Sequence, residues 1–144
     1  MKISTIFLFL LLSLGINKNQ EEKLQGKWKL ESYDVFSKVL TSEPFMMGTE
    51  EQKSALLKEI NFALENTYFE FRGDTIIMDD AVNKQIDRKK AIYFLEGDRL
   101  VINRVDKIHS KDYRLVEVAD STLVLELVYV ENSKKNYAVF KKVN

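Results

Sequence analysis

The stretch TYFEFRGDTIIMD, residues 67–79, decides the fold because it has the pattern of two short strands joined by a tight turn. Gly73-Asp74 is a typical two-residue hairpin turn. With that turn, apolar residues face each other across the hairpin, Phe71 opposite Ile76 and Phe69 opposite Met78. A register that pairs like with like predicts an antiparallel hairpin with one buried face.

A second hairpin is predicted over residues 88–104, with Gly97-Asp98 as its turn. The register again pairs like with like, placing Glu96 opposite Arg99, Leu95 opposite Leu100 and Tyr93 opposite Ile102. The chain therefore contains a run of antiparallel strands with short connections.

Four further strands are expected, over residues 24–36, 112–118, 122–130 and 135–143. In the first, Trp28, Leu30 and Ser32 share a face. The turn at 119–121 leaves its register open. Eight short strands fit a sandwich or an up-and-down barrel, and we predict an all-β, eight-stranded antiparallel up-and-down barrel.

One helix interrupts the strands at residues 49–66, between the first and second of them. Thr49 followed by Gln52 predicts a capping box at its start. The helix is expected to cover an apolar outer face of the barrel, formed by Ile77, Ile92, Phe94 and Val101. The preceding segment 37–48, which looks disordered, is then the expected gate.

The N-terminus has the pattern of a secretory signal peptide. Lys2 precedes an apolar run from Ile3 to Ile16, and Ser13-Leu14-Gly15 fits a cleavage site. We expect a signal peptide at 1–15, a polar linker at 16–23 and a barrel domain at 24–144. The chain has no cysteine, hence no lipoprotein acceptor, so we expect a periplasmic or extracellular protein without stable membrane insertion after cleavage.

Composition argues against several functions. The 144 residues carry 22 basic and 22 acidic side chains, which disfavours nucleic acid as a partner. His109 is the lone histidine, which disfavours a zinc site. Asp79, Asp80 and Asn83 fit no established calcium loop and are expected as a turn with solvated carboxylates. We expect no catalytic residues, no metal and no cofactor, so the protein is not expected to be an enzyme.

The opening strand resembles that of lipocalins, whose Gly-X-Trp motif matches Gly26-Lys27-Trp28. In that family the Trp closes the base of the barrel and a basic residue of the last strand packs across it, a part that Lys141 or Lys142 fits. The length, opening motif and closing strand resemble small exported lipocalin-like proteins of Bacteroidetes. A helix after the first strand is closer to fatty-acid-binding proteins, so the broader calycin resemblance is the safer one.

The resemblance implies a small hydrophobic ligand inside the barrel. The candidate interior residues are Trp28, Tyr33, Phe69, Phe71, Met78, Tyr93, Leu95, Leu100, Ile102 and Tyr113. Because apolar pockets and apolar cores have the same composition, the pattern leaves open whether the interior is hollow or filled. A filled barrel would instead act as a non-enzymatic interaction module with a protein partner in the cell envelope.

Overall fold

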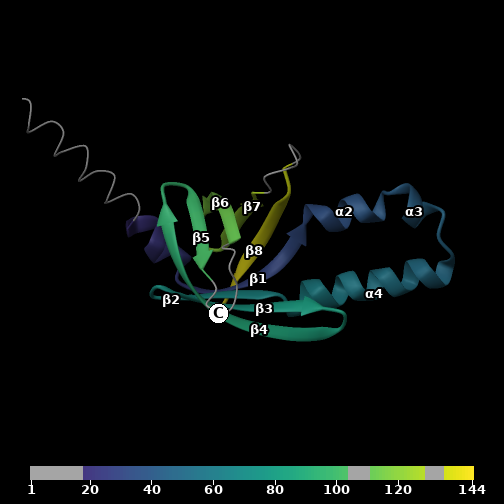
Figure 1. The fold of residues 1–144 in the computed structure, drawn as a ribbon, viewed down its shortest axis with the longest axis horizontal. Coiled ribbons are helices and arrows are strands. Elements are labelled where there is room, and N and C mark those ends of the chain that lie inside the picture. Colours follow the sequence, from purple (N-terminus) through teal and green to yellow (C-terminus); the bar gives the residue numbers. More distant parts are fainter. Residues whose placement is uncertain (1–17, 104–110, 129–134) are drawn as a thin grey trace, which may run out of the picture.

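The computed structural model describes residues 18–103, 111–128 and 135–144. Eight antiparallel strands close into a barrel in chain order, and the last strand pairs with the first (Figure 1). They are β1 Gly26–Tyr33, β2 Tyr68–Arg72, β3 Thr75–Val82, β4 Gln85–Glu96, β5 Arg99–Asn103, β6 Lys111–Val118, β7 Thr122–Leu127 and β8 Tyr137–Val143. The predicted eight-stranded antiparallel barrel is confirmed.

Both predicted hairpin registers are confirmed. Phe69 pairs with Met78 across β2 and β3, and Leu95 pairs with Leu100 across β4 and β5. The register left open by the sequence places Leu115 opposite Leu125 across β6 and β7. A bulge follows Leu115, and it shifts the alternation of the inward-facing side chains.

One end of the barrel is closed around Trp28, which is fully buried. Its indole nitrogen donates a hydrogen bond of 2.7 Å to the carbonyl oxygen of Leu24. The Lys142 ammonium group lies 5.1 Å from the centre of the Trp28 ring, which confirms Lys142 as the basic residue across the Trp. Residues 18–24, within and just after the predicted linker, are helical at this end.

A small hydrogen-bond network joins Tyr93, Gln25 and Gly73 at the closed end. The Tyr93 hydroxyl donates to the Gly73 carbonyl at 2.5 Å and accepts from the Gln25 side-chain nitrogen at 2.8 Å. Burial raises the pKa of the Tyr93 hydroxyl above its ordinary value. The network fixes the first hairpin turn against the start of β1.

The predicted helix is present as α4, Glu50–Asn66, and its capping box between Thr49 and Gln52 is confirmed. Two shorter helices precede it, α2 Asp34–Leu40 and α3 Glu43–Met46. The prediction of a disordered gate at 37–48 is therefore wrong, since most of that segment is helical. The prediction that the first strand continues to residue 36 is also wrong, because β1 ends at Tyr33.

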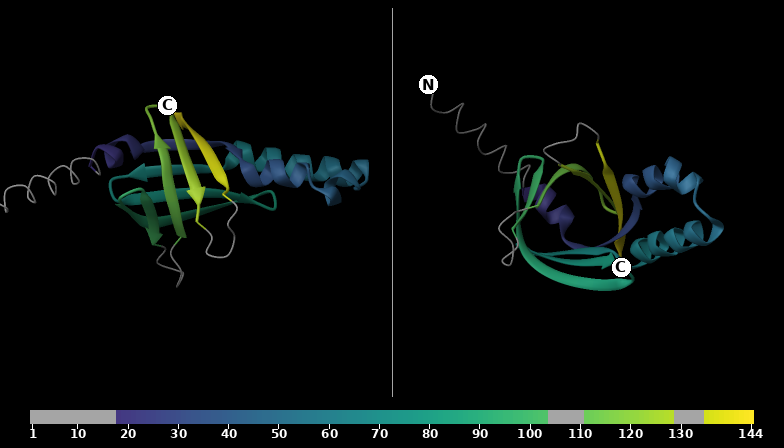
Figure 2. Two further views of the ribbon diagram at one scale, coloured as in Figure 1. Left: turned by 90° about the horizontal axis from the view of Figure 1, so that it is seen from above. Right: turned by 45° about the vertical axis from the view of Figure 1, so that its right-hand side comes forward.

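The helices extend away from one end of the barrel and do not cover its wall. Figures 1 and 2 show α2 and α4 running outward side by side, joined at the far end by α3. Ile92 and Phe94, on the outer face of β4, remain 52% and 37% exposed. The prediction that the helix packs over this outer face is wrong. An amphipathic pattern shows that one helix face is apolar, but it does not identify the surface that this face meets.

Two further differences arise within strands. A register shift between Leu30 and Ser32 leaves Ser32 exposed, although simple alternation places it inward.

The predicted turn with solvated carboxylates is wrong, since Asp79 and Asp80 lie within β3. Asp79 is buried and accepts two hydrogen bonds from Arg88, at 2.6 and 2.8 Å. These bonds lower the pKa of Asp79.

Candidate functional site

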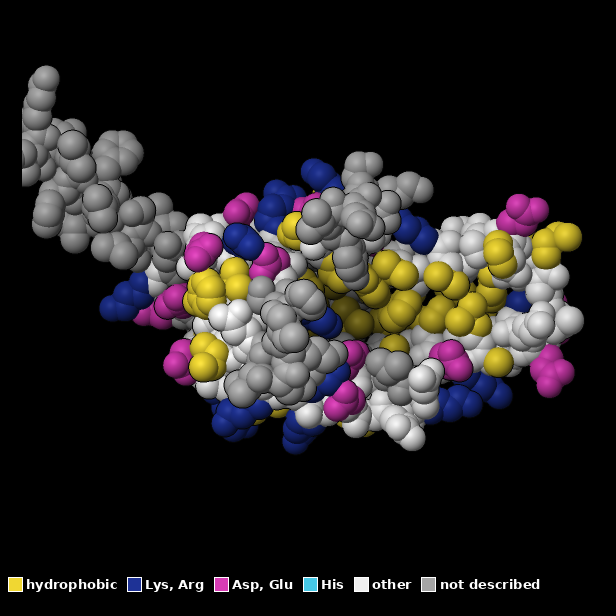
Figure 3. All heavy atoms as spheres, in the orientation of Figure 1, with side chains coloured by type: hydrophobic (Ala, Val, Ile, Leu, Met, Phe, Trp, Pro, Cys, Tyr) yellow, Lys and Arg dark blue, Asp and Glu magenta, His cyan; other side chains and the backbone are white. Residues whose placement is uncertain are grey.

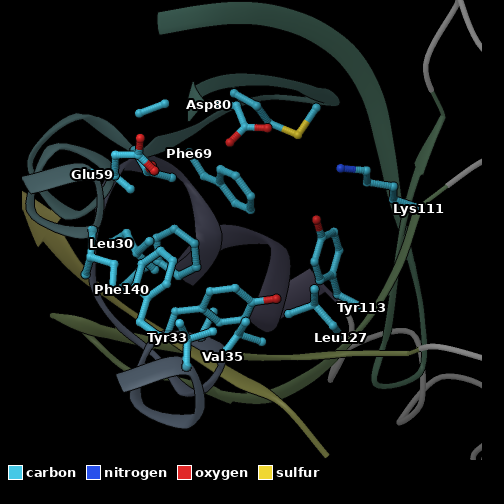
Figure 4. A pocket seen from close by; sticks show the side chains of 18 of the residues that line it. Leu30, Tyr33, Val35, Glu59, Phe69, Asp80, Lys111, Tyr113, Leu127 and Phe140 are labelled. Atoms are coloured by element: carbon cyan, nitrogen blue, oxygen red, sulfur yellow. The ribbon is translucent and has the colours of Figure 1, made fainter. Parts of the chain in front are cut away.

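A cavity of about 470 Å³ occupies the open end of the barrel, opposite Trp28. Pockets that hold one small organic molecule commonly have about 300–1,000 Å³. Most of the side chains that line it are apolar (Figure 4). They come both from the strands and from the helical insert, the segment between β1 and β2 that contains α2, α3 and α4. The size and lining fit a single small molecule with a large apolar part.

Aromatic rings form a large part of the cavity wall. The rings of Phe69 and Phe140 stack with their centres 4.7 Å apart, and the Tyr113 ring meets Phe69 edge-on at 6.3 Å. Tyr33 meets Phe36 edge-on at 5.3 Å, where β1 passes into α2. Because rings in mutual contact restrict one another's rotation, this lining is largely preformed.

The helices extend the apolar lining beyond the barrel. Figure 3 shows hydrophobic side chains along a groove between α2 and α4 that leads toward the barrel centre. The helical residues that line the cavity are Val35, Phe36 and Val39 of α2 and Leu56, Glu59, Ile60 and Ala63 of α4. The apolar face of α4 therefore meets the cavity, where it covers one side of the barrel mouth.

Polar side chains gather at the mouth. Asp80 and Asn83 come from the β3–β4 hairpin, Lys89 from β4 and Lys111 from β6. Lys89 forms an ion pair of 2.8 Å with Asp87. The cavity thus has an apolar interior and a charged rim, an arrangement suited to an amphiphile whose head stays near water.

The sequence-predicted interior residues divide into two groups. Tyr33, Phe69, Met78 and Tyr113 line the cavity. The remaining six, Trp28, Phe71, Tyr93, Leu95, Leu100 and Ile102, belong to the buried core and do not line the cavity. The barrel is therefore filled at one end and hollow at the other, which answers the question that the sequence left open.

Sequence reasoning missed the contribution of the insert and of β8. Apolar residues at helical spacing occur within Asp34–Leu40, at Val35, Phe36 and Val39. This pattern could have indicated a helix, but it is too short to separate a helix from the end of a strand. Ala138 and Phe140 alternate on β8 with outward residues, yet nothing local distinguishes a strand residue that lines a cavity from one that fills a core.

The described residues show no candidate metal centre. Within 18–103, 111–128 and 135–144, no group of three or more His, Cys, Asp or Glu side chains could hold a metal ion. No helix in this part of the chain has the length and hydrophobicity needed to cross a membrane. His109 and the predicted signal peptide lie outside the described residues.

Comparisons with known proteins give the fold. No protein-family model matches the sequence, and no curated protein matches it. The structure is similar to a lipocalin-like protein from Bacteroides uniformis, with a TM-score of 0.54 and 15% identity over 84% of this chain and 99% of that one.

Two further structures are similar. An uncharacterised protein from Bacteroides eggerthii has a TM-score of 0.50 and 12% identity over 83% of this chain and 99% of that one. As-p18, an extracellular fatty acid binding protein, has a TM-score of 0.44 and 16% identity over 85% and 97% of the two chains. At these identities the likeness to the two Bacteroides proteins concerns the fold alone. The closed eight-stranded barrel is therefore a lipocalin-like fold.

Proposed function

We propose that this protein is a non-enzymatic binding protein for a small hydrophobic ligand held at the open end of its barrel. The observation that carries the proposal is the cavity of about 470 Å³ with an apolar lining. Removing the apolar surface of a ligand from water there supplies about 25 cal/mol per Å² before ordering costs. The preformed aromatic lining reduces those ordering costs on the protein side.

A pair of substitutions on one helix tests the proposal. Ala63→Trp adds a large side chain to the cavity lining of α4, whereas Ala55→Trp adds the same side chain at an exposed position of that helix outside the lining. Binding of a fluorescent apolar probe such as 1-anilinonaphthalene-8-sulfonate should fall at least tenfold for Ala63→Trp and stay unchanged for Ala55→Trp. Equal binding by the two variants would contradict a site in this cavity.

Native mass spectrometry of residues 16–144 purified from the native host provides the second test. A reproducible mass excess that is released on denaturation is the expected result. A bare mass that persists after incubation with a host lipid extract would contradict ligand binding.

We also propose that the protein is exported, because Lys2, the apolar run 3–16 and Ser13-Leu14-Gly15 have the order of a signal peptide. N-terminal sequencing of the protein from periplasmic or extracellular fractions should give Ile16 as the first residue. Recovery of the chain from the cytoplasm with its N-terminus intact would contradict export.

A role as an interaction module in the cell envelope is a second candidate, favoured by the exposed Ile92 and Phe94 on the outer face of β4. The double substitution Ile92→Thr and Phe94→Thr should then abolish co-purification of an envelope protein. Ligand binding in the cavity should be unaffected by that change, which separates the two candidates.

A further inference from the structure

Two charged side chains of opposite sign face the open end of the cavity from well-separated strands. Asp80 belongs to β3 and Lys111 to β6, and both line the cavity. Figure 4 shows the Asp80 carboxylate and the Lys111 ammonium group pointing into the cavity from different sides. Charged groups at the edge of an apolar cavity are available to orient a ligand head.

Neither charge is neutralised by another side chain among the residues that the structure describes. Lys89, the other lysine of the lining, is paired with Asp87, whereas Asp80 and Lys111 belong to none of the ion pairs formed by the described ranges. In particular, they form no ion pair with each other. Among the described residues, no ion pair has to break before a ligand meets both charges.

The lining charges that belong to no ion pair among the described residues lie on opposite sides of the mouth according to their sign. Glu59 of α4 lies on the same side of the cavity as Asp80, and Lys111 lies across from them beside the Tyr113 ring (Figure 4). A purely anionic head drawn to Lys111 would face two carboxylates, and a purely cationic head drawn to the carboxylates would face an ammonium group. A head that carries both charges meets a complementary group on each side.

On the basis of the proposed function, we propose that the ligand is a zwitterionic amphiphile. Its cationic group lies beside Asp80 and its anionic group beside Lys111. Its apolar tail contacts the rings of Phe69, Tyr113 and Phe140 and the groove between α2 and α4. Lys111 is exposed and Asp80 is part-buried, so the head keeps part of its hydration and the desolvation cost is limited.

Four probes that share a twelve-carbon tail and differ in head charge test the inference. They are dodecylphosphocholine, dodecanoate, dodecyltrimethylammonium and the uncharged dodecyl maltoside, each titrated calorimetrically below its critical micelle concentration. Each partly exposed charge pair is expected to contribute about a three- to fivefold gain in affinity. Dodecylphosphocholine should therefore bind about tenfold more tightly than the uncharged probe, and more tightly than either singly charged probe.

Charge-removing variants give opposite results for the two singly charged probes. Asp80→Asn should weaken dodecylphosphocholine about threefold to fivefold and strengthen dodecanoate. Lys111→Gln should weaken dodecylphosphocholine and dodecanoate and strengthen dodecyltrimethylammonium. Binding of dodecyl maltoside should be unchanged in both variants, which also shows that each variant retains a folded cavity.

Matched controls remove one charge of each sign elsewhere. Asp120→Asn lies in the β6–β7 turn and Lys90→Gln on the outer side of β4, and both positions are exposed and outside the lining. Neither control should change the order of the four affinities.

Three results would overturn the inference. If dodecanoate or dodecyltrimethylammonium binds the unaltered protein as tightly as dodecylphosphocholine, or if the two variants behave as the controls do, the head is not zwitterionic. In those cases binding of dodecyl maltoside would still support an apolar ligand. Failure of all four probes to bind would overturn the proposed function as well.

Discussion

At Gly26, a lysine side chain from the last strand passes close to the backbone at the closed end of the barrel. The φ of Gly26, +117°, lies in a region that residues with a side chain rarely adopt, and a Cβ there would lie 2.9 Å from Cε of Lys142. Gly26 therefore lets Lys142 reach across the ring of Trp28. The Gly-X-Trp motif has a physical basis in this chain, because its first residue makes room for the group that covers its third.

Replacing Gly26 by alanine should destabilise the protein by about 2–3 kcal/mol, through backbone strain and the contact with Lys142. Gly73→Ala is the matched control, since its φ is +60° and no atom lies within 4 Å of the added Cβ. That change should cost about 1 kcal/mol. Urea unfolding of both variants provides the measurement.

Adding Lys142→Ala to Gly26→Ala should not produce the full sum of the two single losses, because the steric part of the Gly26 change disappears with the lysine side chain. Strict additivity would show that the cost at Gly26 comes from the backbone alone.

The Asp79–Arg88 pair predicts a specific acid sensitivity. The pKa of Asp79 lies below its ordinary value of 3.8 in the folded protein. A depressed pKa contributes stability that is complete above the unfolded-state value and is lost as the pH falls through the folded-state value. Because the Arg88 side chain is 70% exposed, Asp79→Asn should cost only about 1 kcal/mol at pH 7.

Unfolding measured from pH 7 downward should show this difference unchanged to about pH 5 and shrinking below about pH 4. The exposed Asp120→Asn serves as the control, and it should follow the unaltered protein at every pH. A loss for Asp79→Asn that is as large at pH 3 as at pH 7 would contradict the assignment.

At the scale of elements, the helical insert is the part of the chain whose stability depends most on local signals. The α4 helix meets the barrel mouth through Ile60, its one buried residue. Its N-terminal half lies far from the strands (Figure 1). The capping box therefore supports a helix start that tertiary packing supports little.

Thr49→Ala removes the hydroxyl that accepts a hydrogen bond from the Gln52 backbone. The expected cost is about 1 kcal/mol, which corresponds to about fivefold faster hydrogen exchange for amides of the first turns of α4. Ser54→Ala, exposed on the same helix, should leave exchange unchanged or slightly slower. Strand amides should not respond to either change, and a uniform effect over the barrel would contradict local opening.

The sequence predicted local features better than the placement of elements. The pairing of Phe69 with Met78 follows from a turn of two residues and from alternation, which are both local. The orientation of α4 is different, because Leu56 and Ile60 mark an apolar face but do not specify whether it meets a wall or a mouth. The bulge between Leu30 and Ser32 also depends on the pairing with β8 and leaves no local signal.

For the candidate site, the sequence predicted which side chains face inward but not which of them line the cavity. Alternation identifies Phe69 and Leu100 equally as inward-facing residues, yet Phe69 lines the cavity and Leu100 is in the solid core. The difference depends on the height of each residue in the barrel, which is set by the whole strand order. The sequence predicts a turn at Asp80, but β3 continues to Val82 and the chain turns at Asn83 and Lys84, whose φ angles are 51° and 59°.

Across the whole molecule, side chains are closely packed at the closed end of the barrel and surround a cavity at the open end. Leu123 and Leu127 lie on the same strand, β7. Leu123 is completely buried in the core, whereas Leu127 lines the cavity. Truncating a side chain in a close-packed region creates a new void, whereas truncating one beside an existing cavity removes fewer contacts.

Leu123→Ala should therefore destabilise the protein by about 3–4 kcal/mol and Leu127→Ala by about 1–2 kcal/mol. Chemical unfolding of the two variants measures the difference. Equal losses would contradict a barrel that is solid at one end and hollow at the other.

The insert also leaves and re-enters the barrel at neighbouring points. The Leu30 amide donates a hydrogen bond of 3.0 Å to the Thr67 carbonyl, and Lys29 pairs with Tyr68 where β1 and β2 meet. Residues 34–66 are thus one continuous segment whose ends are held together by strands that pair without it. Replacing this single stretch, in evolution or by design, is therefore expected to change the helices that face the cavity while every strand keeps its register.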